Sequence, residues 1–249
     1  MNIVVDIGNS RVKLGYFKGE QLLAVDAFPH AEFPKAAFES EAWQTYSGQS
    51  KYLGLASVGN ILMVQATESL LATQPQMKML RIDQRTPLPI GNRYASKNTL
   101  GMDRVCASVA AFKRAKKGPL LVINAGTAMT FDFVDANDDY LGGSIAPGLR
   151  TRFRALETFT AKLPLIQKEG PAPLIGDSTE TSIRSGVLNG MLAEIEGMVA
   201  RYQELAGAAL KVYLTGGDAE FLGNHLKSVT FVDANLLLYG INTIVLHHA

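Results

Sequence analysis

Two short segments of the chain carry residues suited to holding phosphate groups. One spans residues 6–10, with the sequence DIGNS, and the other spans residues 124–128, with the sequence NAGTA. In each, a glycine lets the backbone approach a ligand, and nearby N–H and hydroxyl groups can donate to phosphate oxygens. A β-forming run precedes and follows each segment, which predicts a strand, a tight turn and a returning strand. Either hairpin alone would most often be structural, but the pair indicates a site for a nucleoside triphosphate.

The first hairpin also carries charge. Asp6 stands just before the turn, where a carboxylate can hold Mg²⁺ through water. Lys13 could add a positive charge near the phosphates, although a solvated strand lysine is almost as good an interpretation. Across both hairpins, we expect the phosphate contacts to come from Gly8, Asn9, Ser10, Lys13 and Thr127.

A third segment predicts the start of a helix with an acidic residue in its first turn. It comprises Gly101, Met102, Asp103 and Arg104. A carboxylate within hydrogen-bond reach of an acceptor hydroxyl can orient it and take its proton during phosphoryl transfer. The helix dipole favours the ionised form of Asp103 at this position. The alternative is an acidic residue that only stabilises the first helical turn.

Composition excludes several other classes of protein. The 249 residues carry a formal net charge of +1, which argues against a nucleic-acid partner held by bulk electrostatics. With a single cysteine, Cys106, no intrachain disulfide or cysteine-based zinc site can form. The sequence contains no signal-peptide pattern and no apolar stretch long enough to cross a bilayer, so we expect a cytoplasmic protein without a membrane partner.

The elements that must position these residues follow one plan twice. Each half of the chain predicts three strands and then alternating helices and strands, which favours two α/β domains with a mixed sheet each. We place the domains at residues 1–117 and 118–249, around a shared cleft. A single helix is expected over residues 33–46, and a long helical stretch over residues 178–205 is expected to be interrupted at Gly186 and Gly190.

This layout resembles the superfamily of acetate kinase, sugar kinases, Hsp70 and actin, whose domains have a ribonuclease H-like fold. Within it, the motifs are similar to those of the type III pantothenate kinases. The similarity runs from residue 3 to about 240 and rests on residues 6–10, 101–104 and 124–128 and on the glycine-rich segment 142–148. It implies ATP-dependent phosphorylation of pantothenate to 4′-phosphopantothenate, the first step of coenzyme A synthesis. It also implies Mg²⁺ with ATP, and a homodimer.

The resemblance also implies individual roles. Asp103 corresponds to the catalytic residue, and Gly216 and Gly217 to the turn that lies against the adenosine, although a plain strand-to-helix turn is a serious alternative there. The positions that match the family's pantothenate contacts are Tyr94, Gly101, Met102, Arg104 and Thr179. An arginine guanidinium suits the carboxylate of pantothenate or a phosphate oxygen.

The sequence departs from the family at Asn124, where an aspartate is usual and is associated with a monovalent cation, K⁺ or NH₄⁺. An amide oxygen can coordinate a cation but brings no negative charge. We therefore expect a weakened cation site, or compensation by another group such as Asp132.

Two alternatives to a pantothenate kinase stay open. One is a different small-molecule kinase of the superfamily, against which the 101–104 motif counts. The other is a non-catalytic regulator, since relatives of the family have been described as accessory factors in transcription. The presence of Asp6, Asp103 and Thr127 together favours catalysis, because a binding module has no need of all three.

Overall fold

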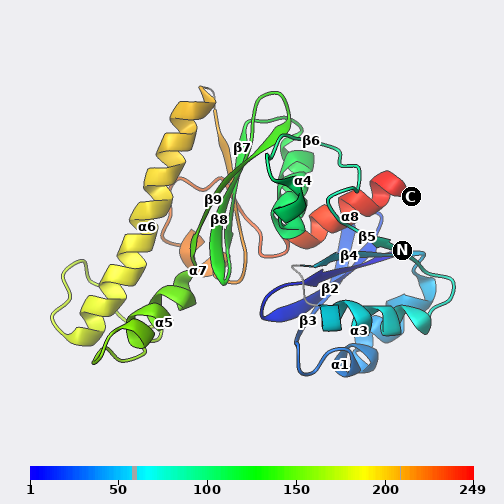
Figure 1. Ribbon diagram of the computed structural model, residues 1–249, viewed down its shortest axis with the longest axis horizontal. Coiled ribbons are helices and arrows are strands. Elements are labelled where there is room, and N and C mark those ends of the chain that lie inside the picture. The colour runs from blue at the N-terminus through cyan, green and yellow to red at the C-terminus, as the bar shows by residue number, and fades with distance from the viewer. Residues whose placement is uncertain (58–60, 208) are drawn as a thin grey trace. The chain divides into compact units, whose positions relative to one another are not determined.

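The computed structural model describes residues 1–57, 61–207 and 209–249, which fold into two compact units (Figure 1). Unit 1 comprises residues 1–116, 138–140 and 235–249, and unit 2 comprises residues 117–137 and 141–234. Within the described residues, none of the helices combines the length and the apolar character that crossing a membrane requires.

Unit 1 contains a five-stranded mixed sheet. Its strands are β1 (Asn2–Ile7), β2 (Arg11–Lys18), β3 (Gln21–Pro29), β4 (Tyr52–Ser57) and β5 (Lys78–Arg81), in the spatial order β3-β2-β1-β4-β5. The first three strands run antiparallel, and β4 and β5 run parallel to β1. Alternate side chains of β1 and β2 enter an apolar core that also contains Trp43 and Leu70.

The helices of unit 1 are α1 (Lys35–Glu39), α2 (Glu41–Tyr46), α3 (Ile61–Ala72), α4 (Met102–Ala115) and α8 (Leu236–His248), with 3₁₀ turns at Ser47–Gln49 and Lys97–Thr99. The single helix predicted over residues 33–46 is wrong. Ser40 breaks it, because its hydroxyl accepts a hydrogen bond from the Trp43 N–H at 3.1 Å and so caps α2. The same hydroxyl donates to Asp26 on β3 at 2.7 Å.

The C-terminal helix α8 returns to unit 1 and packs closely against it. A Cβ at Gly240 would overlap the backbone of Cys106 on α4, so only glycine permits this helix contact. The buried Asn242 accepts a hydrogen bond from the Asn2 side chain at 3.1 Å and donates to the Gly19 carbonyl at 2.9 Å. These bonds attach the end of the chain to its first strands.

Unit 2 repeats the sheet plan. Its strands are β7 (Leu120–Ala125), β8 (Ala128–Val134), β9 (Asp139–Pro147), β10 (Lys211–Thr215) and β11 (Phe231–Val232), in the order β9-β8-β7-β10-β11. Numbered within each unit, both sheets read 3-2-1-4-5, and in both the first two strands form an antiparallel hairpin. The two-residue strand β6 (Gly91–Asn92) pairs with residues 139 and 140 at the start of β9, which belong to unit 1.

Three helices cover the sheet of unit 2: α5 (Leu149–Phe159), α6 (Thr179–Ala206) and α7 (Ala219–Gly223). The interruption predicted at Gly186 and Gly190 is wrong, since α6 is continuous over 28 residues (Figure 1). Its apolar face, including Met191 and Ile195, enters the core of the unit, and this burial outweighs the weak helix propensity of glycine.

Candidate active site

The β1–β2 hairpin places Asp6 and Lys13 opposite one another near its turn. The two residues are cross-strand partners, so their side chains leave the same face of the sheet. The turn is closed by the Gly8 N–H, which donates to the Arg11 carbonyl at 3.0 Å, and Asn9 and Ser10 are exposed within it. The predicted phosphate-binding residues of this segment therefore surround one open turn.

His30 contacts this turn, which the sequence analysis did not predict. Its Nε2 lies 3.0 Å from the Gly8 carbonyl oxygen. The contact joins residues 22 positions apart, and no local pattern around His30 predicts it. Both polar groups of the Gly8 backbone therefore have a partner.

Asp103 lies in the first turn of α4, where the sequence predicted it. Gly101 is the N-cap residue and makes no side-chain cap. A Cβ at Gly101 would lie 2.5 Å from a carboxylate oxygen of Asp103, so the carboxylate occupies the space that a side chain at position 101 would fill. Gly101 thus permits the orientation of the proposed catalytic group.

The carboxylates of Asp6 and Asp103 are close enough to interact electrostatically. The pKa of Asp6 is raised to about 7, first by burial and second by the negative charge of Asp103, while Lys13 acts in the opposite direction. Two like charges in a partly buried site favour a bound cation or proton. This pair can therefore hold a cation such as Mg²⁺.

Cys106, which follows Asp103 on α4, contributes no nucleophile. It is fully buried, and burial raises the pKa of its thiol well above the usual value. The charges of Asp103 and Asp6 act in the same direction. The thiol therefore stays protonated at neutral pH, where it behaves as a small apolar core residue.

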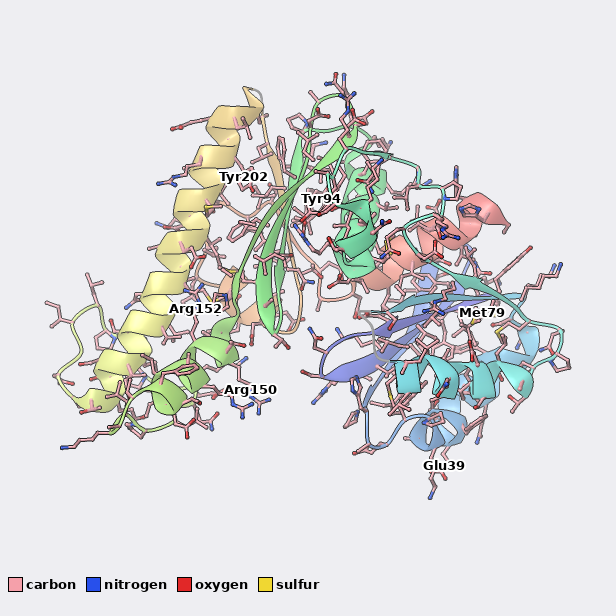
Figure 2. All side chains as sticks on the ribbon, in the orientation of Figure 1. Glu39, Met79, Tyr94, Arg150, Arg152 and Tyr202 are labelled. Carbon is pink, nitrogen blue, oxygen red and sulfur yellow. The ribbon has the colours of Figure 1, made fainter. Side chains whose placement is uncertain are left out.

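The structure brings together Arg104 and Tyr94, two residues assigned to substrate binding. Figure 2 labels Tyr94. The guanidinium carbon of Arg104 lies 5.7 Å from the centre of the Tyr94 ring, within the range of a cation–π contact. Tyr94 is half-buried, and its N–H donates to the Asn92 side chain at 3.0 Å. Arg104 is only 6% exposed, which suits the recognition of a single anionic group rather than a solvated surface role.

A cavity of about 350 Å³ in unit 1 lies beside the start of α4. Gly101 and Met102 line it, together with Asn98, Thr99 and Leu100. Met102 is 4% exposed, so it contributes an apolar wall. The volume and the mixture of apolar and amide groups suit a small organic molecule.

The β7–β8 hairpin in unit 2 makes close backbone contacts with the turn that follows β10. Gly216 has a φ of +101°, and a Cβ there would lie 2.6 Å from the Asn124 amide oxygen and 2.5 Å from the Ala125 carbonyl. The Asp218 N–H donates to that carbonyl at 3.0 Å. The predicted adenosine turn thus packs directly on the predicted second phosphate hairpin.

Thr127 lies in the turn of this hairpin, and two neighbours bind its carbonyl. The Gly148 N–H donates to it at 3.1 Å and the Thr151 hydroxyl at 2.7 Å. These bonds join the turn to the start of α5. They leave the side chain of Thr127 exposed, as a phosphate contact requires.

Asp132 lies on the same face of the hairpin as Asn124. Asn124 pairs with Thr130 across the strands, and the Thr130 hydroxyl donates to the Asp132 carboxyl group at 2.8 Å. Asp132 is 1% exposed. A carboxyl group is therefore present near Asn124, within the same unit, at a depth that water reaches poorly.

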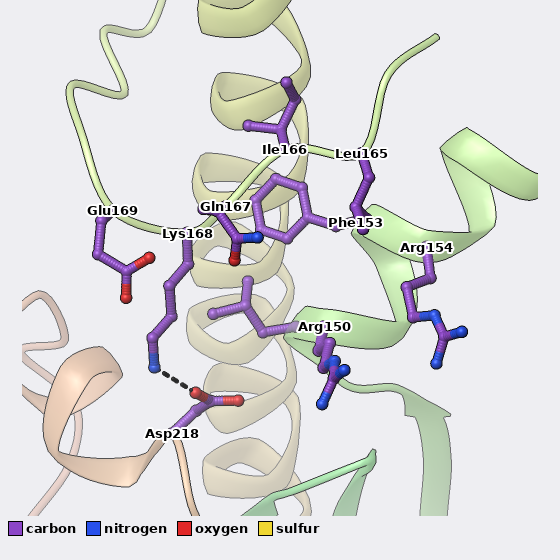
Figure 3. Close-up of a pocket in the computed structure, with 10 residues that line it drawn as sticks. Arg150, Phe153, Arg154, Leu165, Ile166, Gln167, Lys168, Glu169 and Asp218 are labelled. Carbon is purple, nitrogen blue, oxygen red and sulfur yellow. Dashed lines mark hydrogen bonds and ion pairs between the residues drawn. The ribbon is translucent and has the colours of Figure 1, made fainter.

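A second cavity, of about 320 Å³, lies beside Asp218 in unit 2 (Figure 3). Its lining includes the apolar Leu149, Phe153 and Ile166 and the charged Arg150, Arg154 and Glu169. At its edge the Lys168 ammonium group pairs with the Asp218 carboxylate at 2.7 Å. This mixture of apolar and charged groups suits a ligand that carries both a ring and polar atoms.

Thr179, the last substrate residue predicted, is the first residue of α6 and is exposed. The preceding Ser178 caps the helix through a capping box with Thr181. Thr179 belongs to unit 2, whereas Tyr94 and Arg104 belong to unit 1. Within the described parts of the chain, no three His, Cys, Asp or Glu residues gather as a metal cluster.

Two comparisons of the sequence with known proteins point to one family. The sequence profile of one family, described as type III pantothenate kinase, matches residues 2–201. A type III pantothenate kinase of Flavobacterium johnsoniae is 39% identical over 238 residues, which cover 96% of this chain and 94% of the relative.

Solved structures show the same fold at low identity. A Campylobacter jejuni protein described as a Baf family transcriptional activator has a TM-score of 0.64 at 22% identity, with 99% of this chain and 98% of the other covered. A ROK hexokinase from Thermus thermophilus has a TM-score of 0.50 at 13% identity, with 99% of each chain covered. The predicted α/β fold of two similar actin-like domains, each with a mixed sheet, is confirmed.

Proposed function

This chain belongs to the type III pantothenate kinase family, and from that membership we propose that it phosphorylates pantothenate with ATP. The product is 4′-phosphopantothenate, and the reaction is the first step of coenzyme A biosynthesis. The observation that carries the proposal is the carboxylate of Asp103, held in the first turn of α4 over Gly101 and within electrostatic range of Asp6.

In the proposed reaction, the primary hydroxyl of pantothenate attacks the γ-phosphorus of ATP. A bond forms between the hydroxyl oxygen and that phosphorus, while the bond from the phosphorus to the β–γ bridging oxygen breaks and ADP leaves. Asp103 orients the hydroxyl and accepts its proton. Bound Mg²⁺ supplies charge neutralisation on the phosphates, and Asp6 is the residue that holds it through water.

The remaining groups position the two substrates. In unit 1, phosphate oxygens are contacted by the turn at Gly8, Asn9 and Ser10 and by Lys13. In unit 2, Thr127 makes the phosphate contact. The adenosine lies against Gly216 and Gly217, with its base in the cavity beside Asp218, where Leu149, Phe153 and Ile166 offer apolar contacts.

Pantothenate binds beside the start of α4 in this proposal. Arg104 neutralises its carboxylate, Tyr94 orients the guanidinium, and Gly101 and Met102 form the adjoining wall. Thr179 gives a further polar contact. A buried arginine stacked on an aromatic ring supports recognition of one carboxylate, which acetate or a neutral sugar would use less well.

We also propose a homodimer that works in the cytoplasm. Phe159 at the end of α5 and Leu174 and Ile175 shortly before α6 are each at least 83% exposed. Large apolar side chains at such exposure are typical of a surface that another chain covers. Light scattering coupled to size exclusion tests this, and a monomer at micromolar concentration would contradict it.

The kinase proposal is tested by incubating the purified protein with MgATP and pantothenate and following ADP and phosphopantothenate together. Equal formation of both products is expected, with no product from acetate or hexoses. ADP without phosphopantothenate would indicate another acceptor. No turnover by a protein that still binds MgADP would favour the non-catalytic regulator, whose fold the Campylobacter protein shares.

A further inference from the structure

The chain between α5 and α6, residues 160–178, contains no helix or strand. We call it the connecting segment. Backbone carbonyls in such a segment need partners elsewhere, and side chains of α6 supply several of them. Ser185 donates to the Leu174 carbonyl at 2.9 Å, and Asn189 donates to the Ala172 carbonyl at 3.2 Å.

Arg184 makes the most extensive of these attachments. Its guanidinium group donates to the Gln167 carbonyl at 3.2 Å and to the Pro171 carbonyl at 3.3 Å, and it also pairs with Glu180 one helical turn earlier. Arg184 is 3% exposed. A charge this deeply buried is stable only when its donors are satisfied, and the planar fork of arginine matches three acceptors at once.

Gly170 shapes the connecting segment around this guanidinium. Its φ of +113° lies in the region that favours glycine, and a Cβ there would lie 3.0 Å from the guanidinium carbon of Arg184. The segment therefore wraps closely over the buried charge. A substitution at Gly170 or at Arg184 therefore disturbs the same contact.

The part of the connecting segment that Arg184 holds also lines the cavity beside Asp218. Gln167, whose carbonyl Arg184 holds, and the next residue, Lys168, both line that cavity (Figure 3). Lys168 then closes its edge by pairing with Asp218. The other partner of Arg184, Glu180, is adjacent to Thr179.

We propose that Arg184 is a positioning residue that holds the connecting segment as one wall of the nucleotide site. The inference rests on the proposed function, in which the cavity beside Asp218 receives the base. Because Arg184 touches neither substrate nor reacting atoms, its loss weakens nucleotide binding and leaves the chemical step largely intact. That is the signature of binding energy shared by ground state and transition state.

Calorimetric titration of the full-length protein with MgADP tests this, combined with steady-state kinetics where turnover occurs. Arg184→Lys keeps the charge but cannot make three planar bonds, and Gly170→Ala disturbs the same contact from the exposed segment. Each is expected to weaken MgADP binding and raise the KM for ATP on the order of tenfold, with kcat changed less than about threefold.

Arg152→Lys is the matched control. Arg152, labelled in Figure 2, donates to the Pro147 carbonyl at 2.8 Å and pairs with Glu194 on α6. Neither partner belongs to the connecting segment, so the variant loses the same kind of bonds at another place. Its MgADP affinity should stay within about twofold of the parent.

The inference is overturned if Arg184→Lys and Gly170→Ala lower the melting temperature but bind MgADP as tightly as Arg152→Lys does. A parent protein that binds no MgADP would overturn it as well. If the parent binds MgADP through this contact yet phosphorylates no pantothenate, the inference stands and the proposed acceptor is wrong.

Discussion

The β1–β2 and β7–β8 hairpins carry different groups at the same position of their ladders. One cross-strand pair away from the last pair before the turn, Asp6 faces Lys13 in the first hairpin and Asn124 faces Thr130 in the second. The first hairpin lies near the carboxylate of Asp103 and has a raised pKa at Asp6. The second makes close backbone contacts with Gly216 and Gly148.

This difference separates two requirements of phosphoryl transfer. Charge that is brought together in unit 1 is costly without a ligand and becomes favourable when a cation or phosphate arrives. The hairpin of unit 2 has no charged cross-strand pair at this position, and its close backbone contacts can present a rigid shape to the nucleotide. The comparison predicts that variants in the first hairpin change chemistry and pH dependence, and that variants in the second change fit.

The largest expected effect comes from Asp103→Asn in unit 1. The amide keeps the shape of the side chain but cannot accept the hydroxyl proton, so kcat should fall about 10²- to 10⁴-fold. Single-turnover measurements with MgATP and pantothenate check this. Unchanged MgADP affinity serves as the control, and a fall of less than about fivefold would reduce Asp103 to a helix-stabilising residue.

Asp6→Asn should separate stability from activity. The folded pKa of Asp6, about 7, lies above its ordinary value of 3.8, so the folded state holds the proton more tightly. Stability from this group is complete below about pH 4 and is lost as the pH rises towards 7, at a total cost on the order of a few kcal/mol. The variant removes that loss.

In EDTA, Asp6→Asn should therefore unfold at higher denaturant concentration than the parent at pH 8, with the difference vanishing near pH 4. Turnover should nevertheless fall at every pH, because the residue proposed to hold Mg²⁺ is gone. Chemical denaturation at several pH values measures the first effect. A parent and variant with parallel pH profiles would contradict the raised pKa.

Gly216→Ala tests the shape of the second hairpin. The φ of +101° and the approach of Asn124 and Ala125 both oppose a Cβ, so we expect a loss of about 1–3 kcal/mol of stability. Gly217→Ala is the matched control, because its Cβ would meet nothing within 4 Å. Gly217→Ala should be as stable as the parent. Its MgADP affinity should fall only if the nucleotide lies against residue 217. Equal melting temperatures for both variants would contradict the packing.

These groups differ in how well a single sequence could predict them. The hairpins and the start of α4 depend on local signals, a glycine turn between β-forming runs and a helix beginning at Met102, and both are confirmed. The contact of His30 with Gly8 and the attachment of the connecting segment by Arg184 join distant residues. No local pattern specifies them. The residue roles and the domain division at residue 117 stay predictions.

The helix predicted over residues 33–46 failed for a related reason. Its apolar spacing suits a helix, but the hydroxyl of Ser40 bonds both Asp26 on a distant strand and the Trp43 N–H. A tertiary partner thus converts a helix interior into a cap. The continuous α6 is the converse case, since packing of its apolar face overrides two glycines that sequence propensity treats as breaks.

The smallest expected effect concerns Asn124, the neutral counterpart of Asp6. Asn124→Asp places a second carboxyl group on the face that already holds the buried Asp132, and two carboxyl groups there repel when both are ionised. A monovalent cation relieves this repulsion. The variant should therefore gain a several-fold stimulation of turnover by K⁺ over Na⁺, whereas the parent should respond weakly.

Asp132→Asn in the parent decides whether Asp132 compensates for Asn124. If it does, the weak response of the parent to K⁺ disappears in Asp132→Asn, and Asn124→Asp combined with Asp132→Asn responds less than Asn124→Asp alone. If both single variants retain the K⁺ response of the parent, the face shared by Asn124 and Asp132 does not bind the cation. The second hairpin would then contribute shape and no cation site, which would sharpen its contrast with Asp6 and Asp103.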